Sequence, residues 1–234
     1  MSTEEKIYSG KTKDIHRLPN GHLLIVFKDD VTGENGVVDP GANTVMGQIQ
    51  GKGRMSLGLT RYFFQRLQDE GIPTHLVSVD LDRNAMEVKE AVLPGKGRGG
   101  LEFVCRRKAY GSFLKRYGAH IKMELQDLDY LVEITLKDDE RGDPLINDDA
   151  LVTLGFLTRP QLDNAKDLTR RIARIVENDL RERGLDLIDM KVEFGLIDGA
   201  VALIDEISAD AMRVMDDAGK MLSHEEMYRS LLSS

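Results

Sequence analysis

The chain has 234 residues, and its 32 Lys and Arg against 40 Asp and Glu give a formal net charge of −8 at pH 7. Because the basic residues are dispersed along an acidic chain, the composition argues against a nucleic-acid-binding or membrane-binding surface, and any anionic ligand needs a local positive site. The single cysteine, Cys105, excludes an internal disulfide framework and a cysteine metal cluster, no apolar run reaches the length of a membrane span, and we expect a protein of the reducing cytoplasm.

The N-terminal third of the chain reads as β-rich. Strand-like runs on either side of a Pro-Asn-Gly turn predict a hairpin, and the next stretch, rich in Gly, Asp and Asn, favours turns over helix. Apolar residues at helical spacing follow, and then another strand-like run. We expect strands in residues 6–17, 22–28 and 74–80, a long loop in residues 29–53, and a helix from residue 57 to residue 70. These elements predict a small β-rich domain over residues 1–85.

The remainder, residues 86–234, is predicted to form a larger α+β domain. It contains further strand-like runs and a long segment that is amphipathic over several helical turns. We expect strands in residues 85–92, 101–109, 130–136, 187–196 and 200–204, helices in residues 112–117, 147–154 and 158–183, and a short final helix after an exposed turn within residues 216–234. Residues 93–100 are Gly-rich and basic, which predicts a surface loop between two strands.

The first motif that suggests chemistry is a glycine followed by two lysines, Gly10-Lys11-Thr12-Lys13. It lacks the GxxxxGK[ST] spacing of a P-loop. A glycine beside two lysines on a hairpin can still lie over nucleotide phosphates, as the Gly-rich loop of protein kinases does. The alternative is a pair of solvated lysines on an exposed hairpin, and this segment by itself leaves both interpretations open.

A second motif places Arg106 at the end of a strand that reads as buried, shortly before Gly111-Ser112 opens a helix. A guanidinium, a hydroxyl and helix N-terminal amides in this arrangement suit a phosphate or a carboxylate. We therefore predict an anion site here. The acidic turn that follows, residues 136–148, has a helix cap as its ordinary explanation, and the scattered histidines support neither a zinc site nor a His-based triad.

The segment 191–213 places charged groups on what otherwise reads as a buried β-hairpin with Asp198-Gly199 as its turn. Buried charges need a partner, a metal or a catalytic role. Paired carboxylates at the mouth of a sheet suit Mg²⁺, which binds one or two carboxylates and completes its octahedron with substrate phosphates and water. The alternative is a salt-bridged hairpin in which Lys191 is the counter-ion.

Which carboxylates meet depends on the hairpin register, and two registers are possible. With a two-residue turn, Ile197 pairs with Ala200 and Glu206 shares the face of Glu193. With a three-residue turn and a bulge, the pairing shifts by one residue and Asp205 takes that place. We favour the bulged register because it leaves the opposite face of the hairpin apolar.

A series of motifs runs along almost the whole chain: YSGKTKDI, FKDD, QGKG, EGIPTH, VCRRKAYGSFLKRYG, GDPLIND, DMKVEFG and DEISADAMR. In this order they resemble the SAICAR synthetase family, the phosphoribosylaminoimidazole-succinocarboxamide synthases. The resemblance implies an α+β, ATP-grasp-related fold of two lobes, with the nucleotide in the cleft between them. It also implies an ATP-dependent ligase of purine biosynthesis. Such a ligase joins L-aspartate to the carboxylate of carboxyaminoimidazole ribonucleotide through an acyl phosphate, giving SAICAR, ADP and phosphate.

The resemblance further implies ATP and Mg²⁺ as cofactors, small-molecule substrates as the partners, and a role for particular residues. It implies Lys11 and Lys13 for the ATP phosphates, Glu193 and Asp205 for Mg²⁺, Arg106, Ser112 and Arg213 for the ribonucleotide phosphate, Lys137 and Asp143 for aspartate binding and loop ordering, and Lys191 and Asp210 as catalytic residues on the nucleotide substrate. It leaves a homo-oligomer open.

The chain departs from the family pattern around the substrates. Ser208-Ala209-Asp210 stands where the family has Ser-Pro-Asp, Met215 replaces an aromatic residue, residues 39–48 replace a shorter loop, and residues 93–100 form an insertion. The rival enzyme is therefore a paralogue that joins a different amine to a related carboxylated azole nucleotide. The rival of another class is a non-catalytic nucleotide-binding protein of the same fold, against which the intact lysines and metal carboxylates argue.

Overall fold

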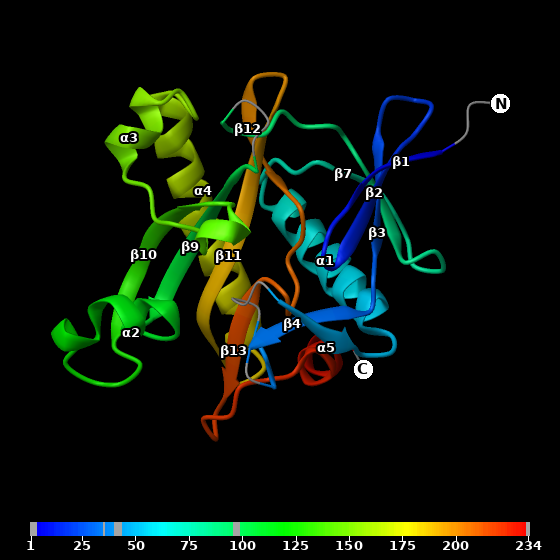
Figure 1. Ribbon diagram of the computed structural model, residues 1–234. Helices are drawn as coiled ribbons and strands as arrows, with labels where there is room; N and C mark the ends of the chain where they lie inside the picture. Colours follow the sequence, from blue (N-terminus) through cyan, green and yellow to red (C-terminus); the bar gives the residue numbers. More distant parts are fainter. Residues whose placement is uncertain (1–3, 35, 40–43, 96–98, 233–234) are drawn as a thin grey trace.

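The computed structural model describes residues 4–34, 36–39, 44–95 and 99–232 (Figure 1). Within these residues the strands form three sheets, and neighbouring strands in each sheet run antiparallel. Antiparallel sheets combined with separate helices define the α+β class, which confirms the predicted class. No helix in the described part of the chain is long and apolar enough to cross a membrane.

The first sheet contains the N-terminal strands and a later hairpin in the order β1-β2-β3-β8-β7. Its strands are β1 (Glu5–Ser9), β2 (Lys13–Arg17), β3 (Leu23–Phe27), β7 (Leu76–Asp80) and β8 (Ala85–Val88). The single strand predicted in residues 6–17 is wrong, because the backbone N–H of Gly10 donates to the carbonyl of Lys13 at 2.8 Å and turns the chain. The two predicted phosphate lysines therefore lie at a tight turn, with Lys13 as the first residue of β2.

A small third sheet replaces most of the predicted loop in residues 29–53. It consists of β4 (Asp30–Glu34), β5 (Val37–Val38) and β6 (Val45–Gln48), in the order β5-β4-β6. Residues 35 and 40–43 of the predicted loop lie outside the described residues. The loop prediction is wrong for the strands because it weighed the turn preference of Gly, Asp and Asn, whereas backbone pairing across the sheet overrides local propensity.

Helix α1 (Lys52–Asp69) begins earlier than the predicted residue 57. The reason is Asp29, whose carboxylate accepts hydrogen bonds from the backbone N–H groups of Gly51 and Gly53 at 3.0 and 2.9 Å. The helix contacts β3, helix α4 (Arg159–Arg181) and the final helix α5 (His224–Leu232). Figure 1 shows α1 between the first sheet and the long strands of the second sheet.

The second sheet has the order β10-β9-β11-β12, with one further strand paired to β11. Its strands are β9 (Leu101–Lys108), β10 (Asp127–Leu136), β11 (Leu185–Ile197), β12 (Ala200–Ile204) and β13 (Met212–Asp216). Strand β13 was not predicted, because charged residues interrupt its short apolar run. The strands before and after the predicted loop 93–100 belong to different sheets, and residues 96–98 lie outside the described residues.

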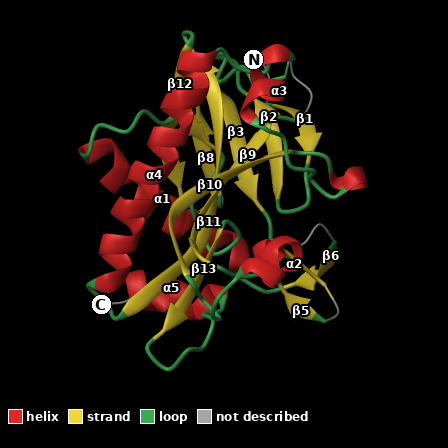
Figure 2. Cartoon of the chain, turned by 90° about the vertical axis from the view of Figure 1, so that its left-hand side faces the viewer, coloured by secondary structure: helices red, strands yellow, loops and turns green. Residues whose placement is uncertain are grey.

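The main core lies between α4 and one face of the second sheet (Figure 2). Leu168, Ile172 and Val176 of α4 belong to one buried cluster with Phe103 of β9 and Val192 of β11. The other two predicted helices are α2 (Ser112–Tyr117) and α3 (Asp148–Thr153), and two short 3₁₀ helices cover Gly118–His120 and Asp139–Arg141. Because α4 covers one face, the polar residues at alternate positions of these strands must lie on the opposite face.

Candidate active site

The site is built on the face of the second sheet opposite α4. In β11, Met190 and Val192 belong to the core, whereas Asp189, Lys191 and Glu193 alternate with them and line cavities. Strand alternation therefore separates a fully apolar face from a charged one along a single strand.

Neighbouring strands extend this charged face. Arg106 of β9 pairs in register with Asp189, and Glu102 of β9 pairs with Glu193. The side chains also interact: Arg106 Nη1 lies 2.6 Å from Asp189 Oδ2, and Lys191 Nζ lies 2.7 Å from Glu102 Oε1. Each charge thus has a neighbour of opposite sign, as buried charges require.

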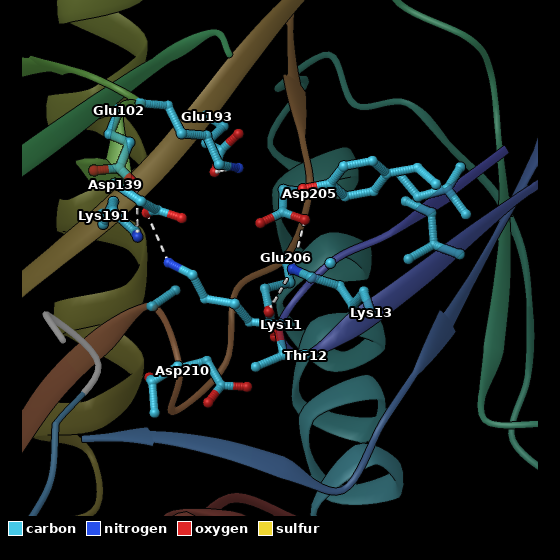
Figure 3. Close-up of a pocket in the computed structure, with 17 residues that line it drawn as sticks. Lys11, Thr12, Lys13, Glu102, Asp139, Lys191, Glu193, Asp205, Glu206 and Asp210 are labelled. Atoms are coloured by element: carbon cyan, nitrogen blue, oxygen red, sulfur yellow. Dashed lines mark hydrogen bonds and ion pairs between the residues drawn. The ribbon is translucent and has the colours of Figure 1, made fainter. Parts of the chain in front are cut away.

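The first cavity opens between the first sheet and this charged face (Figure 3). Lys13 reaches across it, with Nζ 2.5 Å from Asp205 Oδ1 and 2.6 Å from Glu206 Oε1, and Lys11 forms an ion pair with Asp139 at 2.7 Å. Its lining includes Lys11, Lys13, Glu102, Lys137, Lys191, Glu193, Asp205, Glu206 and Asp210. Both lysines predicted for ATP therefore line the same cavity as both carboxylates predicted for a metal.

The pKa values of two carboxylates in this cavity are shifted in opposite directions. Burial raises the pKa of Glu193 even though Lys137 lies beside it, with an Nζ–Oε1 distance of 2.7 Å. Burial also opposes ionisation of Asp205, but the charges of Lys13 and Lys137 lower its pKa below the usual range. Burial opposes the charge of Lys13 in the same way, and Asp205 and Glu206 nevertheless raise its pKa. Lys13 and Asp205 are therefore held as a charged pair.

The predicted bulged register of the hairpin is wrong. Ile197 pairs with Ala200, so Asp198-Gly199 is a two-residue turn, and its φ values of 52° and 80° are those that such a hairpin turn demands. Strand β12 ends at Ile204, and Asp205 has a φ of 64°, which interrupts the alternation of side chains. For this reason Asp205 and its neighbour Glu206 both reach Lys13, a result that neither register predicted.

The second cavity contains the predicted anion site. Arg106 Nη2 donates to Ser112 Oγ at 2.8 Å, and Arg213 of β13 shares Asp189 with Arg106 through an Nη1–Oδ2 distance of 2.8 Å. Gly111 lies against the Arg213 guanidinium, where an added Cβ would be 3.4 Å away. The three residues predicted for the ribonucleotide phosphate are thus brought together by three different elements.

The two residues predicted in the acidic turn line different cavities. Lys137 lines the first cavity, whereas Asp143 lines the second and accepts a hydrogen bond from the backbone N–H of Asp138 at 2.7 Å. The cavities themselves adjoin, because Glu102, Lys191, Asp210 and Ala211 line both. The two residues predicted to be catalytic, Lys191 and Asp210, therefore lie at the junction.

Several polar residues of the site were not predicted. Glu102 and Asp189 occupy the same strand faces as Arg106 and Lys191, so the period of two in their strands is a signal that could have found them. Lys52 and His224 contact Asp210 from distant segments, and no local pattern connects them. Among the described residues, no group of three His, Cys, Asp or Glu side chains is arranged to hold a metal ion.

On this α+β frame, one cavity brings lysines and carboxylates together and the adjoining cavity brings two arginines and a serine together, a class of site that enzymes use for anionic substrates. The SAICAR synthetase family model matches residues 6–231, and the chain belongs to this family of ligases. It is 51% identical over 213 residues to the phosphoribosylaminoimidazole-succinocarboxamide synthase of Clostridium tetani, covering 90% of this chain and 92% of that protein. The protein of that name from Methanocaldococcus jannaschii is 29% identical over 231 residues, covering 97% and 88%.

Solved structures agree with the family. A type-2 SAICAR synthetase in complex with ADP superposes with a TM-score of 0.85 at 27% identity, covering 98% of both chains. The phosphoribosylaminoimidazole-succinocarboxamide synthase of Ehrlichia chaffeensis gives a TM-score of 0.82 at 28% identity, covering 97% of this chain and 92% of that chain.

Proposed function

We propose that the chain is an ATP-dependent ligase that joins L-aspartate to carboxyaminoimidazole ribonucleotide in purine biosynthesis. The observation that carries the proposal is the pair of adjoining cavities, one with paired lysines and carboxylates and one with two arginines and a serine. A ligase of this kind needs a triphosphate and a phosphorylated azole side by side, and two adjoining cavities support that arrangement.

The chemistry is two displacements. An oxygen of the azole carboxylate attacks the γ-phosphorus of ATP, forming a new O–P bond as the bond to the bridging oxygen breaks and ADP leaves. The amine of aspartate then attacks the carbonyl carbon, the C–N bond forms, phosphate leaves and the amine gives up a proton. Neither step requires a nucleophile from the enzyme, so catalysis rests on positioning and on stabilising charge.

The first cavity suits the triphosphate. Lys11 and Lys13 would bind its phosphates, exchanging their present carboxylate partners Asp139, Asp205 and Glu206 for phosphate oxygens. Once Lys13 transfers to phosphate, the carboxylates become available to a cation.

This exchange supports a Mg²⁺ site at the two carboxylates. Glu193 and Asp205 would hold it, and two carboxylates suffice because Mg²⁺ takes its remaining ligands from substrate phosphates and water. When bound, the cation neutralises charge on the transferring phosphoryl group. Before a cation binds, Lys137, at 2.7 Å from Glu193, balances the charge of that carboxylate.

The second cavity suits the ribonucleotide. Arg106, Ser112 and Arg213 would hold its phosphate, with the guanidinium groups already oriented by Asp189. This leaves the azole carboxylate at the junction, where Lys191 supplies a positive charge and Asp210 an acceptor. Lys137 and Asp143 would bind aspartate and order the loop around it.

We propose that the fold is ATP-grasp-related, with lobes of residues 1–85 and 86–234 on either side of the nucleotide. Two lobes are supported by the separate sheets and by a separate small core of Ile25, Phe27, Leu57, Met86 and Val88. Strand β8 extends the first sheet to Val88, past the boundary proposed at residue 85. Substrates of central metabolism and a buried, reduced cysteine support a cytoplasmic location.

The test is ADP release by the purified protein with ATP, Mg²⁺ and carboxyaminoimidazole ribonucleotide while the amino acid is varied. We expect release that depends on L-aspartate, together with formation of the succinocarboxamide. Release that depends on another amine would replace the proposal by the paralogous ligase, and ADP binding without release under any combination would replace it by the non-catalytic protein.

A further inference from the structure

Asp210 is held by side chains from two helices. Its Oδ1 lies 2.9 Å from Nε2 of His224, the first residue of α5, and its Oδ2 accepts a hydrogen bond from Ser56 Oγ of α1 at 3.2 Å. Lys52, also in α1, forms an ion pair with the same Oδ2. Asp210 itself lies in the segment between β12 and β13 and lines both cavities.

The network is buried. Lys52 is 0% exposed and His224 is 7% exposed, and the side chain of Asp210 is 11% exposed. Burial opposes ionisation of Asp210, but the hydrogen bond from His224 and the charge of Lys52 lower its pKa to about 2. Asp210 is consequently a carboxylate at neutral pH, with about four acceptor positions on its two oxygens.

The contacts with α1 and α5 restrict the carboxylate differently. Lys52 and Ser56 both act on Oδ2, so α1 holds one oxygen of the carboxylate. His224 holds the other oxygen from a different direction. Fixing both oxygens fixes the plane of the carboxylate, and the acceptor position that remains is directed by that plane.

Packing of α5 does not by itself require a histidine at this position. The helix already buries Met227 and Leu231, with 1% and 6% exposure, and Glu226 caps its first turn by accepting from the backbone N–H of Ser223 at 2.9 Å. An apolar residue would fill the same buried space without the cost of burying a polar ring. The imidazole therefore points to a role that depends on its hydrogen bond.

We propose that His224 is a positioning residue of the ligase, which fixes the Asp210 carboxylate so that its free acceptor position faces an N–H or O–H donor of the nucleotide substrate at the cavity junction. This inference rests on the proposed function of the two cavities. The final helix thereby becomes part of the active-site architecture, although it contributes no residue to either cavity lining.

The test compares three variants in the aspartate-dependent ADP-release assay. His224→Leu removes the donor and keeps an apolar side chain, and we expect kcat to fall roughly 100-fold, the loss expected from a small misplacement of a reacting group. KM for ATP should stay close to the wild-type value, since the first cavity keeps its lysines. His224→Gln places an amide nitrogen at a similar reach and should recover most of the loss.

Glu226→Gln is the matched control, because it weakens the start of α5 without touching Asp210. Its kcat should stay near the wild-type value even if its melting temperature falls. A wild-type kcat in His224→Leu, no rescue by His224→Gln, or an equal loss of kcat in Glu226→Gln would each overturn the proposal.

Crystal structures of wild type and His224→Leu separate this inference from the proposed function. If the wild type shows no aspartate-dependent ADP release, the proposed function fails. The side-chain rotamer of Asp210 then tests by itself whether His224 positions the carboxylate. A rotated Asp210 in His224→Leu supports positioning by His224, and an unchanged rotamer overturns it.

Discussion

At the scale of single residues, Lys13 decides the charge balance of the first cavity. Its side chain is 15% exposed and contacts two carboxylates, at 2.5 Å in Asp205 and 2.6 Å in Glu206. The second oxygen of Glu206 accepts from Ser208 Oγ at 2.5 Å, so Glu206 is held between two protein groups. Asp205 instead lies within the electrostatic reach of Lys137 and Lys191 as well. The two neighbouring acids therefore have different roles.

We expect Asp205→Asn to lower kcat by roughly 100-fold, as for loss of one electrostatic contact to the transferring phosphate, and to raise the Mg²⁺ concentration needed for half-maximal rate. Glu206→Gln should cost less, because the amide still accepts a hydrogen bond from Lys13. Steady-state rates at varied Mg²⁺ measure both effects. A larger loss in Glu206→Gln would show that Glu206 is the carboxylate that matters for the metal.

Cys105 offers a prediction about pH. The residue is 1% exposed, and burial raises the pKa of its thiol from 9.0 to about 12. Because the folded pKa lies above the ordinary value, this contribution to stability is complete below pH 9 and is lost as pH rises toward 12. At pH 8 the folded protein should resist iodoacetamide and react only after unfolding in urea, followed by mass spectrometry. Rapid labelling without denaturant would contradict the burial of Cys105.

Much of the candidate site was predictable residue by residue, for reasons that differ between its two halves. Glu193 and Lys191 stand out as charges in an apolar run, and Arg106 stands before a glycine that opens a helix, so local pattern suffices. Asp205 lies in the cavity because its backbone has a positive φ, and a strand register cannot predict that backbone conformation. His224 meets Asp210 only because α5 packs on α1, and that contact depends on the complete fold.

At the scale of elements, α4 is the best determined because its signals agree. Thr158 accepts from the backbone N–H of Gln161, and the Gln161 side chain returns a bond to the backbone N–H of Thr158 at 3.0 Å, which forms a capping box. A proline follows near the start, and the apolar stripe faces the second sheet. By contrast, β4 and β6 have little local strand signal and exist through their mutual pairing.

Removal of this cap should therefore cause a measurable loss of stability. We expect Thr158→Ala to lower the free energy of unfolding by about 1 kcal/mol, while Thr158→Ser keeps the hydroxyl and most of that stability. Urea denaturation followed by circular dichroism measures the difference. Equal stability in Thr158→Ala and the wild type would mean that packing of α4 on the sheet makes the cap unnecessary.

At the scale of the whole molecule, the first cavity lies between two sheets. Residues next to β7 and β8 already bond to the second sheet, because the backbone N–H of His75 donates to Leu203 and that of Val92 donates to Leu196. Lys13 adds a side-chain contact between the two sheets. Lys13 belongs to β2 of the first sheet, and its partners Asp205 and Glu206 follow β12 of the second. A nucleotide bound by Lys11 and Lys13 on one side and by a cation at Glu193 and Asp205 on the other would connect the same two sheets. Binding should thus stabilise the entire chain rather than one part of it.

We expect ADP with Mg²⁺ to raise the melting temperature of the wild type, because a ligand at about 100 times its Kd stabilises the folded state by about 2.7 kcal/mol, which corresponds to roughly 5–10 °C in a chain of this size. Lys13→Met should abolish most of this shift. Lys6→Met is the matched control, since Lys6 pairs with Asp14 on the exposed edge of the same sheet, at 2.6 Å, and lies in neither cavity lining. Differential scanning calorimetry with Mg²⁺ alone, ADP alone and both together separates the contributions. A full shift with Mg²⁺ alone, or an undiminished shift in Lys13→Met, would show that the nucleotide does not connect the two sheets through this cavity.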